Sequence, residues 1–340
     1  MAVPETFKQQ NVFAVYSPIF NVQEAIGVPL ASAVLTAQLP LARDAKPLPT
    51  RRVTRDETRD CTGKYLVGRR LTSRLALWTL TLPTVTAQLA AGLLAMAFSD
   101  AGVPSTGSAP HTHNITRSAS DQLKATSFIV GATDSDEPAE LYSDMVLNSL
   151  EIRGDTSRSK LSATANFIGS ADVDTVVGFT PPACGPVPVA LYPQDCLLTL
   201  AGSDYTDNLR SLLYRYNNNV FSNDDPFPWD AIDVVRLERG VEESLFQFGV
   251  YGTKSHPLYA IAEGEEIEAL SLRLGSATEG TTIISPGAQL TLQDTPIGYA
   301  GEASRSVINL EATPFSVGGA LPDHVTYVGA QAAQFLTVPA

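Results

Sequence analysis

The chain has 340 residues, enough for about two domains that each bury a core. Its hydrophobic share of 44% and charged share of 17% are typical of a globular protein rather than a disordered one. The formal net charge of −13 argues against a protein that grips nucleic acid, because phosphates require a basic surface.

The first residues carry no targeting signal. Residues 1–10 lack an apolar core and a cleavage site, so we expect no signal peptide and a chain made in a cytosol. Residues 11–20 are typical of an opening strand that breaks at Pro18. The longest apolar stretch, 89–98, is too short to span a bilayer.

The segment 51–74 is the one basic concentration in an acidic chain, and acidic residues interrupt it. We predict a strand, a loop near Gly63 and a return strand, followed by a strand over 74–82. A helix is predicted over 85–98, capped by Thr84. Its apolar stripe at helical spacing consists of Val85, Leu89, Leu93 and Met96.

Residues 146–170 form two alternating runs joined by a polar turn at Gly154 and Asp155, which predicts a β-hairpin. Apolar residues at a spacing of two define one face of each run: Val146, Leu150 and Ile152 in the first, and Leu161, Ala163, Ala165 and Phe167 in the second. The opposite face of the second run carries Ser162, Thr164 and Asn166, which would suit a smooth, wetted surface.

Five prolines and two glycines at 178–196 predict a linker, because such a stretch cannot continue a helix or a central strand. Short strands at close intervals follow it. The fold class is therefore mainly β. We predict a first β domain over 1–177, the linker, and a second β domain over 197–340, with a loose duplication as a possibility.

Candidates for chemistry are few. His111 and His113 lie two residues apart and would share a strand face, as paired metal ligands sometimes do, but no further ligand is evident, so we interpret them as strand-edge or subunit-contact residues. Basic neighbours could activate Cys61, yet no base can be located for it. The three scattered cysteines, which also include Cys184 and Cys196, predict free thiols.

The acidic run at 134–140 lacks the central glycine and the spaced glutamate of a calcium loop, so we interpret it as a solvated loop. No nucleophile elbow, phosphate-binding loop or dinucleotide glycine pattern occurs. We therefore expect a non-enzyme with no catalytic residue, metal site or cofactor.

The arginines of 51–74 admit three interpretations: a nucleic-acid patch, a subunit contact with acids on a neighbouring copy, or a solvated hairpin. Interleaved acids, and the absence of aromatic residues apart from Tyr65, weaken the first interpretation.

The layout of the chain resembles a known family. An Arg/Asp-rich strand pair, a short helix, a His-containing strand and an acidic loop precede LYSDMVLNSLEIRGDTSRSKLSATANFIGS. After the linker come LLTLAGSDYTDNLRSLLYRYNNNVFSND and SLFQFGVYGTKSHPLYAIAEGEEIEALSLRLG. From about Thr54 to Leu292 the whole resembles the tail tube proteins, also called major tail proteins, of long-tailed bacteriophages.

The resemblance implies a virion protein of the tail, assembled in the host bacterial cytoplasm. Subunits would close into rings with an inner β-barrel wall, and rings would stack into a tube that delivers genomic DNA without binding it specifically. Two tube-type β-sandwich or barrel halves would give a trimeric, pseudo-sixfold ring; a hexameric ring is the alternative. Tape-measure, tail-tip and tail-terminator proteins would be further partners, and an acidic lumen would let DNA slide.

On this interpretation, charged loops are candidates for contacts between stacked rings. The candidate residues are Arg51, Arg52, Arg55, Arg59, Asp134, Asp136 and Glu137. The alternatives are a capsid-decorating or receptor-binding β-sandwich, the tube of a contractile injection machine, and a β-sandwich hydrolase or carbohydrate-binding module. Trp78 alternates within an apolar strand and is predicted to be core, which weakens the carbohydrate-binding alternative.

Overall fold

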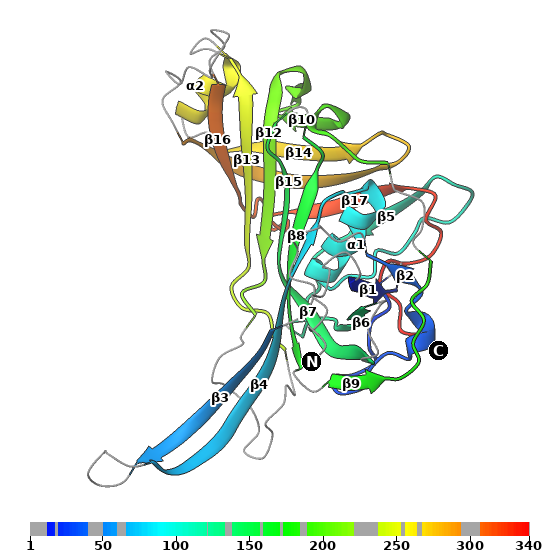
Figure 1. The fold of residues 1–340 in the computed structure, drawn as a ribbon. Coiled ribbons are helices and arrows are strands. Elements are labelled where there is room, and N and C mark those ends of the chain that lie inside the picture. The colour runs from blue at the N-terminus through cyan, green and yellow to red at the C-terminus, as the bar shows by residue number, and fades with distance from the viewer. Residues whose placement is uncertain are drawn as a thin grey trace, which may run out of the picture.

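A computed structural model of the protein shows a mainly β fold (Figure 1). The described residues are 12–17, 20–39, 50–59, 66–120, 122–132, 138–156, 159–170, 173–183, 189–220, 237–252, 256–263, 267–293 and 307–339. At 12, 51–59, 66–74, 263 and 267 the description covers the backbone alone.

Strands provide most of the regular structure. In the first half they are β1 Val12–Tyr16, β2 Ala37–Gln38, β3 Thr50–Arg59, β4 Leu66–Leu82, β5 His111–Ile115, β6 Thr126–Ala132, β7 Ala139–Gly154, β8 Ser162–Ser170 and β9 Val173–Val176. In the second half they are β10 Cys196–Leu200, β11 Ser203–Asp204, β12 Leu209–Asn217, β13 Glu243–Tyr251, β14 Ile267–Gly275, β15 Gly280–Leu292, β16 Val307–Pro314 and β17 His324–Gly329.

Two α-helices accompany these strands, α1 Ala87–Phe98 and α2 Pro257–Glu263. Short 3-10 turns lie at Ser32–Val34, Pro193–Asp195 and Thr206–Asn208. Among the described residues, no helix is long and apolar enough to cross a membrane.

All strand pairs are antiparallel, and β7 takes part in two sheets. The larger sheet runs β3–β4–β8–β7–β12–β13–β16–β15. From β15 it continues along one edge to β14 and β10, and along the other to β17 and β5. The smaller sheet runs β2–β1–β6–β7–β9. The first half of β7 therefore serves the smaller sheet, and its second half serves the larger one.

The turn of β7 from one sheet to the other is centred on Asp144. This residue has φ 59°, which favours glycine and costs other residues free energy, although aspartate tolerates it better than most. Its buried carboxylate accepts hydrogen bonds from the Gly27 N–H at 2.8 Å and from Gln23 Nε2 at 3.1 Å. The Asp144 N–H donates to Gln23 Oε1 at 2.8 Å. These bonds to the 23–27 segment offset the backbone strain and fix the corner.

The predicted helix is confirmed, with its start shifted by two residues. The cap is Thr86 rather than Thr84, because the Thr86 hydroxyl accepts a hydrogen bond from the Leu89 N–H at 3.1 Å. Burial extends well beyond the predicted stripe, of which Val85, Leu93 and Met96 are buried. α1 packs against β7, β15 and β17, so it is buried on nearly every side, and the predicted stripe residue Leu89 is only half-buried (Figure 1).

The predicted hairpin is confirmed as β7–β8, and the core face of its second run is fully buried. One residue of the first run was assigned to the wrong face. The register shifts between Leu147 and Ser149, a β-bulge that places an extra residue in β7. Val146 therefore packs with Leu75 and Ile168 in a second cluster, whereas Leu150 lies in the main core.

The two halves of the chain share one sheet and one core. β7 pairs with β12, and the main hydrophobic cluster draws on Trp78 and Phe167 as well as Tyr214 and Leu310. The predicted linker packs onto the first half, because the Leu191 carbonyl accepts a hydrogen bond from the Leu161 N–H at 2.7 Å. A duplication of two tube-type units stays a prediction.

Candidate functional site: a projecting ribbon and a polar sheet face

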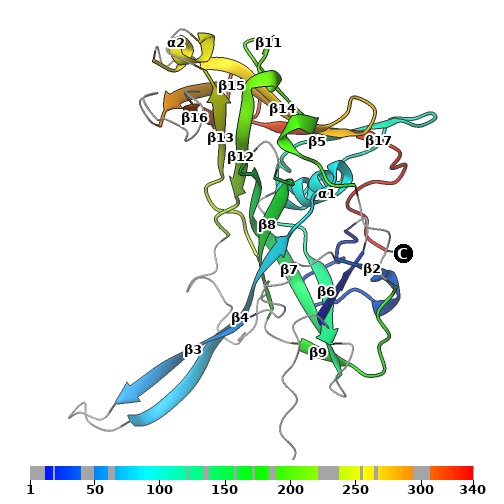
Figure 2. The same cartoon turned by 45° about the horizontal axis from the view of Figure 1, so that its top comes forward.

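A two-stranded ribbon projects from the body of the protein (Figures 1 and 2). β4 pairs with β8 only from Leu75 to Leu82, whereas it pairs with β3 from Leu66 to Leu77. Among the described strands, residues 66–74 of β4 therefore have β3 as their only partner. An isolated pair of strands is marginally stable in water, and its open edges can pair with another chain.

The structure places the predicted arginines together but leaves their predicted partners untested. Arg51, Arg52, Arg55 and Arg59 all lie on β3, where the backbone is described and the side chains are not. The predicted acidic partners Asp134, Asp136 and Glu137 lie outside the described residues. The expected strand, loop and return strand over 51–74 is confirmed for its strands, β3 and β4.

The larger sheet presents a continuous polar face on the side opposite its core, as the alternation of buried and accessible residues along its strands shows. We call this surface the polar face. Its residues are Thr79 and Thr81 of β4, Ser162, Thr164 and Asn166 of β8, Ser149, Glu151 and Arg153 of β7, Leu213, Arg215 and Asn217 of β12, Glu243, Leu245 and Gln247 of β13, and Asn309, Glu311 and Thr313 of β16.

Glu151 contacts both arginines of the polar face, one on the neighbouring strand and one on its own strand. Glu151 faces Arg215 in the register of β7 and β12, and its Oε2 accepts from Arg215 Nη2 at 2.8 Å and from Nε at 3.3 Å. Its other oxygen lies 3.8 Å from Arg153 Nη1. One carboxylate therefore contacts both arginines of this face.

Amide and hydroxyl groups satisfy much of the remaining face. Glu311 Oε2 accepts from Gln247 Nε2 at 3.0 Å and from Gln293 Nε2 at 2.6 Å. Asn166 bridges three strands, because Thr79 donates to its Oδ1 at 2.7 Å and its Nδ2 donates to Ser149 Oγ at 2.8 Å. These cross-strand bonds hold the polar groups in the plane of the sheet.

The polar face is nearly neutral. Its three glutamates and two arginines give a balance of −1, whereas the whole chain carries −13. The acidity of the chain is therefore concentrated elsewhere than on the described part of this face.

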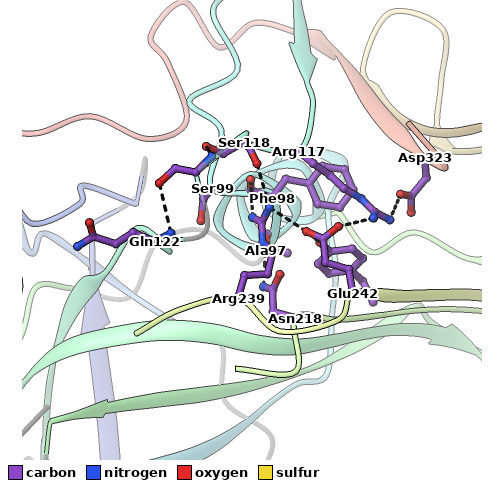
Figure 3. A network of polar contacts seen from close by, with 12 residues as sticks. Ala97, Phe98, Ser99, Arg117, Ser118, Gln122, Asn218, Arg239, Glu242 and Asp323 are labelled. Carbon is purple, nitrogen blue, oxygen red and sulfur yellow. Dashed lines mark hydrogen bonds and ion pairs between the residues drawn. The ribbon is translucent and has the colours of Figure 1, made fainter. Parts of the chain in front are cut away.

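A buried ion network fixes the opposite side of the sheet to α1 (Figure 3). Arg117 contacts both Glu242 and Asp323, and Arg239 Nη1 lies 2.8 Å from Glu242 Oε1. Arg239 also donates to the carbonyl of Phe98 at 3.0 Å, at the C-terminal end of α1. Two cations and two anions thus balance one another.

Two tyrosines of β12 complete the network. Tyr214 donates its hydroxyl proton to Asp323 at 2.8 Å, and Tyr216 donates to Glu242 at 2.9 Å. Burial raises the pKa of both phenols, and the neighbouring carboxylates raise it further. Burial alone would lower the pKa of Arg117, but Asp323, Tyr216 and Glu242 together raise it above its ordinary value. The network is a structural support for the sheet.

Both histidines lie near backbone carbonyls. His111 Nδ1 lies 3.3 Å from the Ser105 carbonyl, and the buried His113 has Nδ1 2.8 Å from the Gly102 carbonyl and Nε2 2.7 Å from the Gln331 carbonyl. β5 lies at the end of the larger sheet, but the burial of His113, which joins β5 to the C-terminal segment, argues against a subunit contact through its side chain. Within the described parts of the chain, no group of three or more His, Cys, Asp or Glu side chains could hold a metal ion.

A hollow at the N-terminal end of α1 contains Cys196, Arg273 and Glu279 among its lining residues. The Cys196 thiol donates to the Tyr192 carbonyl at 3.4 Å, and burial, with a smaller contribution from Asp195, raises its pKa to about 12. A thiol held in its protonated form is a poor nucleophile, so this hollow has no activated cysteine. The predicted free thiol is confirmed at Cys196, while Cys61 and Cys184 lie outside the described residues.

No protein-family model and no curated protein matches this chain. The family resemblance therefore rests on the layout of sequence segments. Alternation at Ser162, Thr164 and Asn166 indicated one strand of the polar face. Its extension over β12, β13 and β16 depends on strand register, which no local pattern contains.

Proposed function

We propose that this protein is a structural subunit of a phage tail tube, in which identical copies close into rings and the rings stack around a DNA-conducting lumen. The observation that carries the proposal is a broad sheet with one polar face that ends in a projecting ribbon with open edges (Figures 1 and 2). Such edges are satisfied most simply by strands of neighbouring copies, and ring closure removes them.

The composition of the polar face is suited to the inner wall of a tube that conducts DNA. A DNA conduit needs a surface that is wetted but holds no array of unpaired cations, because free cations bind phosphates. The threonines, serines and amides of β4, β8 and β7 meet this requirement, and both arginines are paired with Glu151. The polar face would line the lumen, which would then be nearly neutral rather than acidic as the resemblance implies, and the core face with α1 would lie outside it.

Charge separation supports a second copy as the partner of the ribbon. Segment 51–74 has eight basic and three acidic side chains, a balance of +5, so the remainder of the chain carries −18. Opposite charges on two regions of one chain favour contact between copies. In this arrangement the ribbon reaches the acidic surface of a neighbouring subunit.

Negative-stain electron microscopy of the concentrated protein, with two-dimensional averaging, tests the proposal. We expect hollow rings or tubes whose lumen is wide enough for a DNA duplex, and end-on averages distinguish a pseudo-sixfold trimer from a hexamer. Small compact particles at every concentration, also after addition of tail-tip seeds, would contradict it and favour a decoration or receptor-binding protein.

A matched variant separates assembly from folding. Residues 54–73, which include the paired parts of β3 and β4 that project from the body, are replaced by a two-residue Asn-Gly turn. Because the described core residues all lie outside this range, circular dichroism and thermal unfolding should match the native protein while rings are lost. Rings that persist without the ribbon would remove it from the assembly surface.

A further inference from the structure

We propose that Glu151 is the residue that keeps the polar face from binding DNA, because its single carboxylate occupies both arginines of that face. The inference deepens the proposed function and rests on it for the biological role. The physical claim is that this surface would bind a polyanion if Glu151 did not neutralise its arginines. Binding of a polyanion can be measured on the isolated subunit.

The geometry places Glu151 between two cations on neighbouring strands. Arg215 of β12 lies directly opposite it and contacts Oε2 through both Nη2 and Nε. Arg153, two residues further along β7, approaches Oε1 at 3.8 Å. Each carboxylate oxygen is thereby directed at a different guanidinium group. Arg153 has a second acidic neighbour, because its Nε lies 3.9 Å from Oδ1 of the exposed Asp155, whereas Glu151 is the one carboxylate with a described ion pair to Arg215.

The exposed fractions of the three side chains indicate that these ion pairs neutralise surface charge rather than stabilise the fold. The side chains of Arg153 and Arg215 are 51% and 52% exposed, whereas that of Glu151 is 22% exposed. Exposed ion pairs contribute little to folding stability. The cations are open to solvent, so without their common partner they would meet any polyanion that approaches the sheet.

The other two glutamates of the polar face would not neutralise the arginines in place of Glu151. Glu311 is occupied by amide donors of Gln247 and Gln293 and contacts no arginine through a described ion pair. Glu243 lies on the same face and is exposed at the start of β13. Loss of Glu243 changes the net charge by the same amount as loss of Glu151 but unmasks no arginine, so it provides a matched control.

The test compares Glu151→Gln, Glu243→Gln and native protein for binding to a short fluorescent DNA duplex by anisotropy, as a function of salt. We expect Glu151→Gln to bind about tenfold more tightly than native protein at low salt. Arg215 loses its described partner while Arg153 keeps Asp155, so the slope of log K against log salt should become steeper by about 0.9 for Arg215 alone and by at most about 1.8 for both arginines. Glu243→Gln should remain close to native.

A triple variant, Glu151→Gln with Arg153→Gln and Arg215→Gln, tests the mechanism, and it should return binding to the native level. Equal gains for Glu151→Gln and Glu243→Gln would overturn the inference, because net charge alone would then be the cause. No gain for Glu151→Gln, with circular dichroism unchanged, would also overturn it. Because these measurements use the subunit, they stand whether or not electron microscopy shows rings.

Discussion

At the scale of single residues, Glu242 contacts more of the buried ion network than any other carboxylate described here. It contacts Arg117 and Arg239 and accepts the hydroxyl proton of Tyr216 (Figure 3). Removing one partner of a buried ion pair is far more costly than never having had the pair, because a cation is left without compensation.

We therefore expect Glu242→Gln to lower the free energy of unfolding by about 3 kcal/mol. Urea unfolding followed by tryptophan fluorescence measures the change, and Glu311→Gln on the polar face is the control, for which we expect a loss of under about 1 kcal/mol. Equal losses for the two variants would show that the network is not a major source of stability.

Burial of two protonated groups predicts sensitivity to alkali. Burial raises the pKa of Tyr327 from 10.0 to about 12, with a further contribution from Glu279, and that of Cys196 from 9.0 to about 12. Between these values the folded protein binds more protons than the unfolded chain, so its stability is fully present below pH 9 and declines as pH rises towards 12.

The urea midpoint should accordingly fall across this window, and Tyr327→Phe should reduce the fall because one contributing group is gone, while Cys196 and the other buried tyrosines remain. A midpoint that stays constant through the window in native protein would contradict the assignment of both groups as buried.

At the scale of elements, the corner of β7 depends on one side chain. Asp144 adopts φ 59° and is held by the Gly27 N–H and by Gln23. Alanine keeps the strained backbone but loses the carboxylate, so we expect Asp144→Ala to destabilise the protein by about 2 kcal/mol. Asp144→Asn retains an acceptor and tolerance of positive φ, and should cost less than half as much. Thermal unfolding of the pair provides the comparison; equal losses would rule out the carboxylate as the stabilising group.

Sequence patterns predicted the elements better than their surroundings. Alternation located the β7–β8 hairpin, and a capping threonine with an apolar run located α1, because both signals are local. The bulge that moves Val146 to another cluster gives no such signal, and neither does the burial of α1 on nearly every side, which depends on strands far away in the chain.

Tertiary contacts also explain the elements that were missed. α2, β16 and β17 lie in segments for which no element was predicted, although β16 and β17 complete the larger sheet. β15 continues through Pro286 with a register shift against β14, although proline usually interrupts a strand inside a sheet. For the candidate site, the sequence predicted the ribbon and one strand of the polar face. The pairing of Glu151 with Arg215 required the register of β7 and β12.

At the scale of the whole molecule, the shared sheet predicts cooperative unfolding. β7 and β12 pair across the two predicted domains, and one hydrophobic cluster includes residues of both. We expect a single calorimetric transition, with the van't Hoff enthalpy equal to the calorimetric enthalpy. Fragments 1–177 and 197–340 expressed separately should fail to fold, because each would expose half of the common core. Two resolved transitions, or a folded fragment, would contradict this expectation.

The continuity of β4 has a mechanical consequence. The same strand forms one side of the ribbon and then pairs with β8 from Leu75 to Leu82. This second part contains the buried Trp78. A pull on the ribbon along its length is transmitted through covalent backbone into the body, with no hinge between separate elements. Because the bonds between β4 and β8 are perpendicular to the strands, such a load shears all of them together instead of opening them one after another. The ribbon is thus held to the body by a set of hydrogen bonds that together resist a pull along the strand.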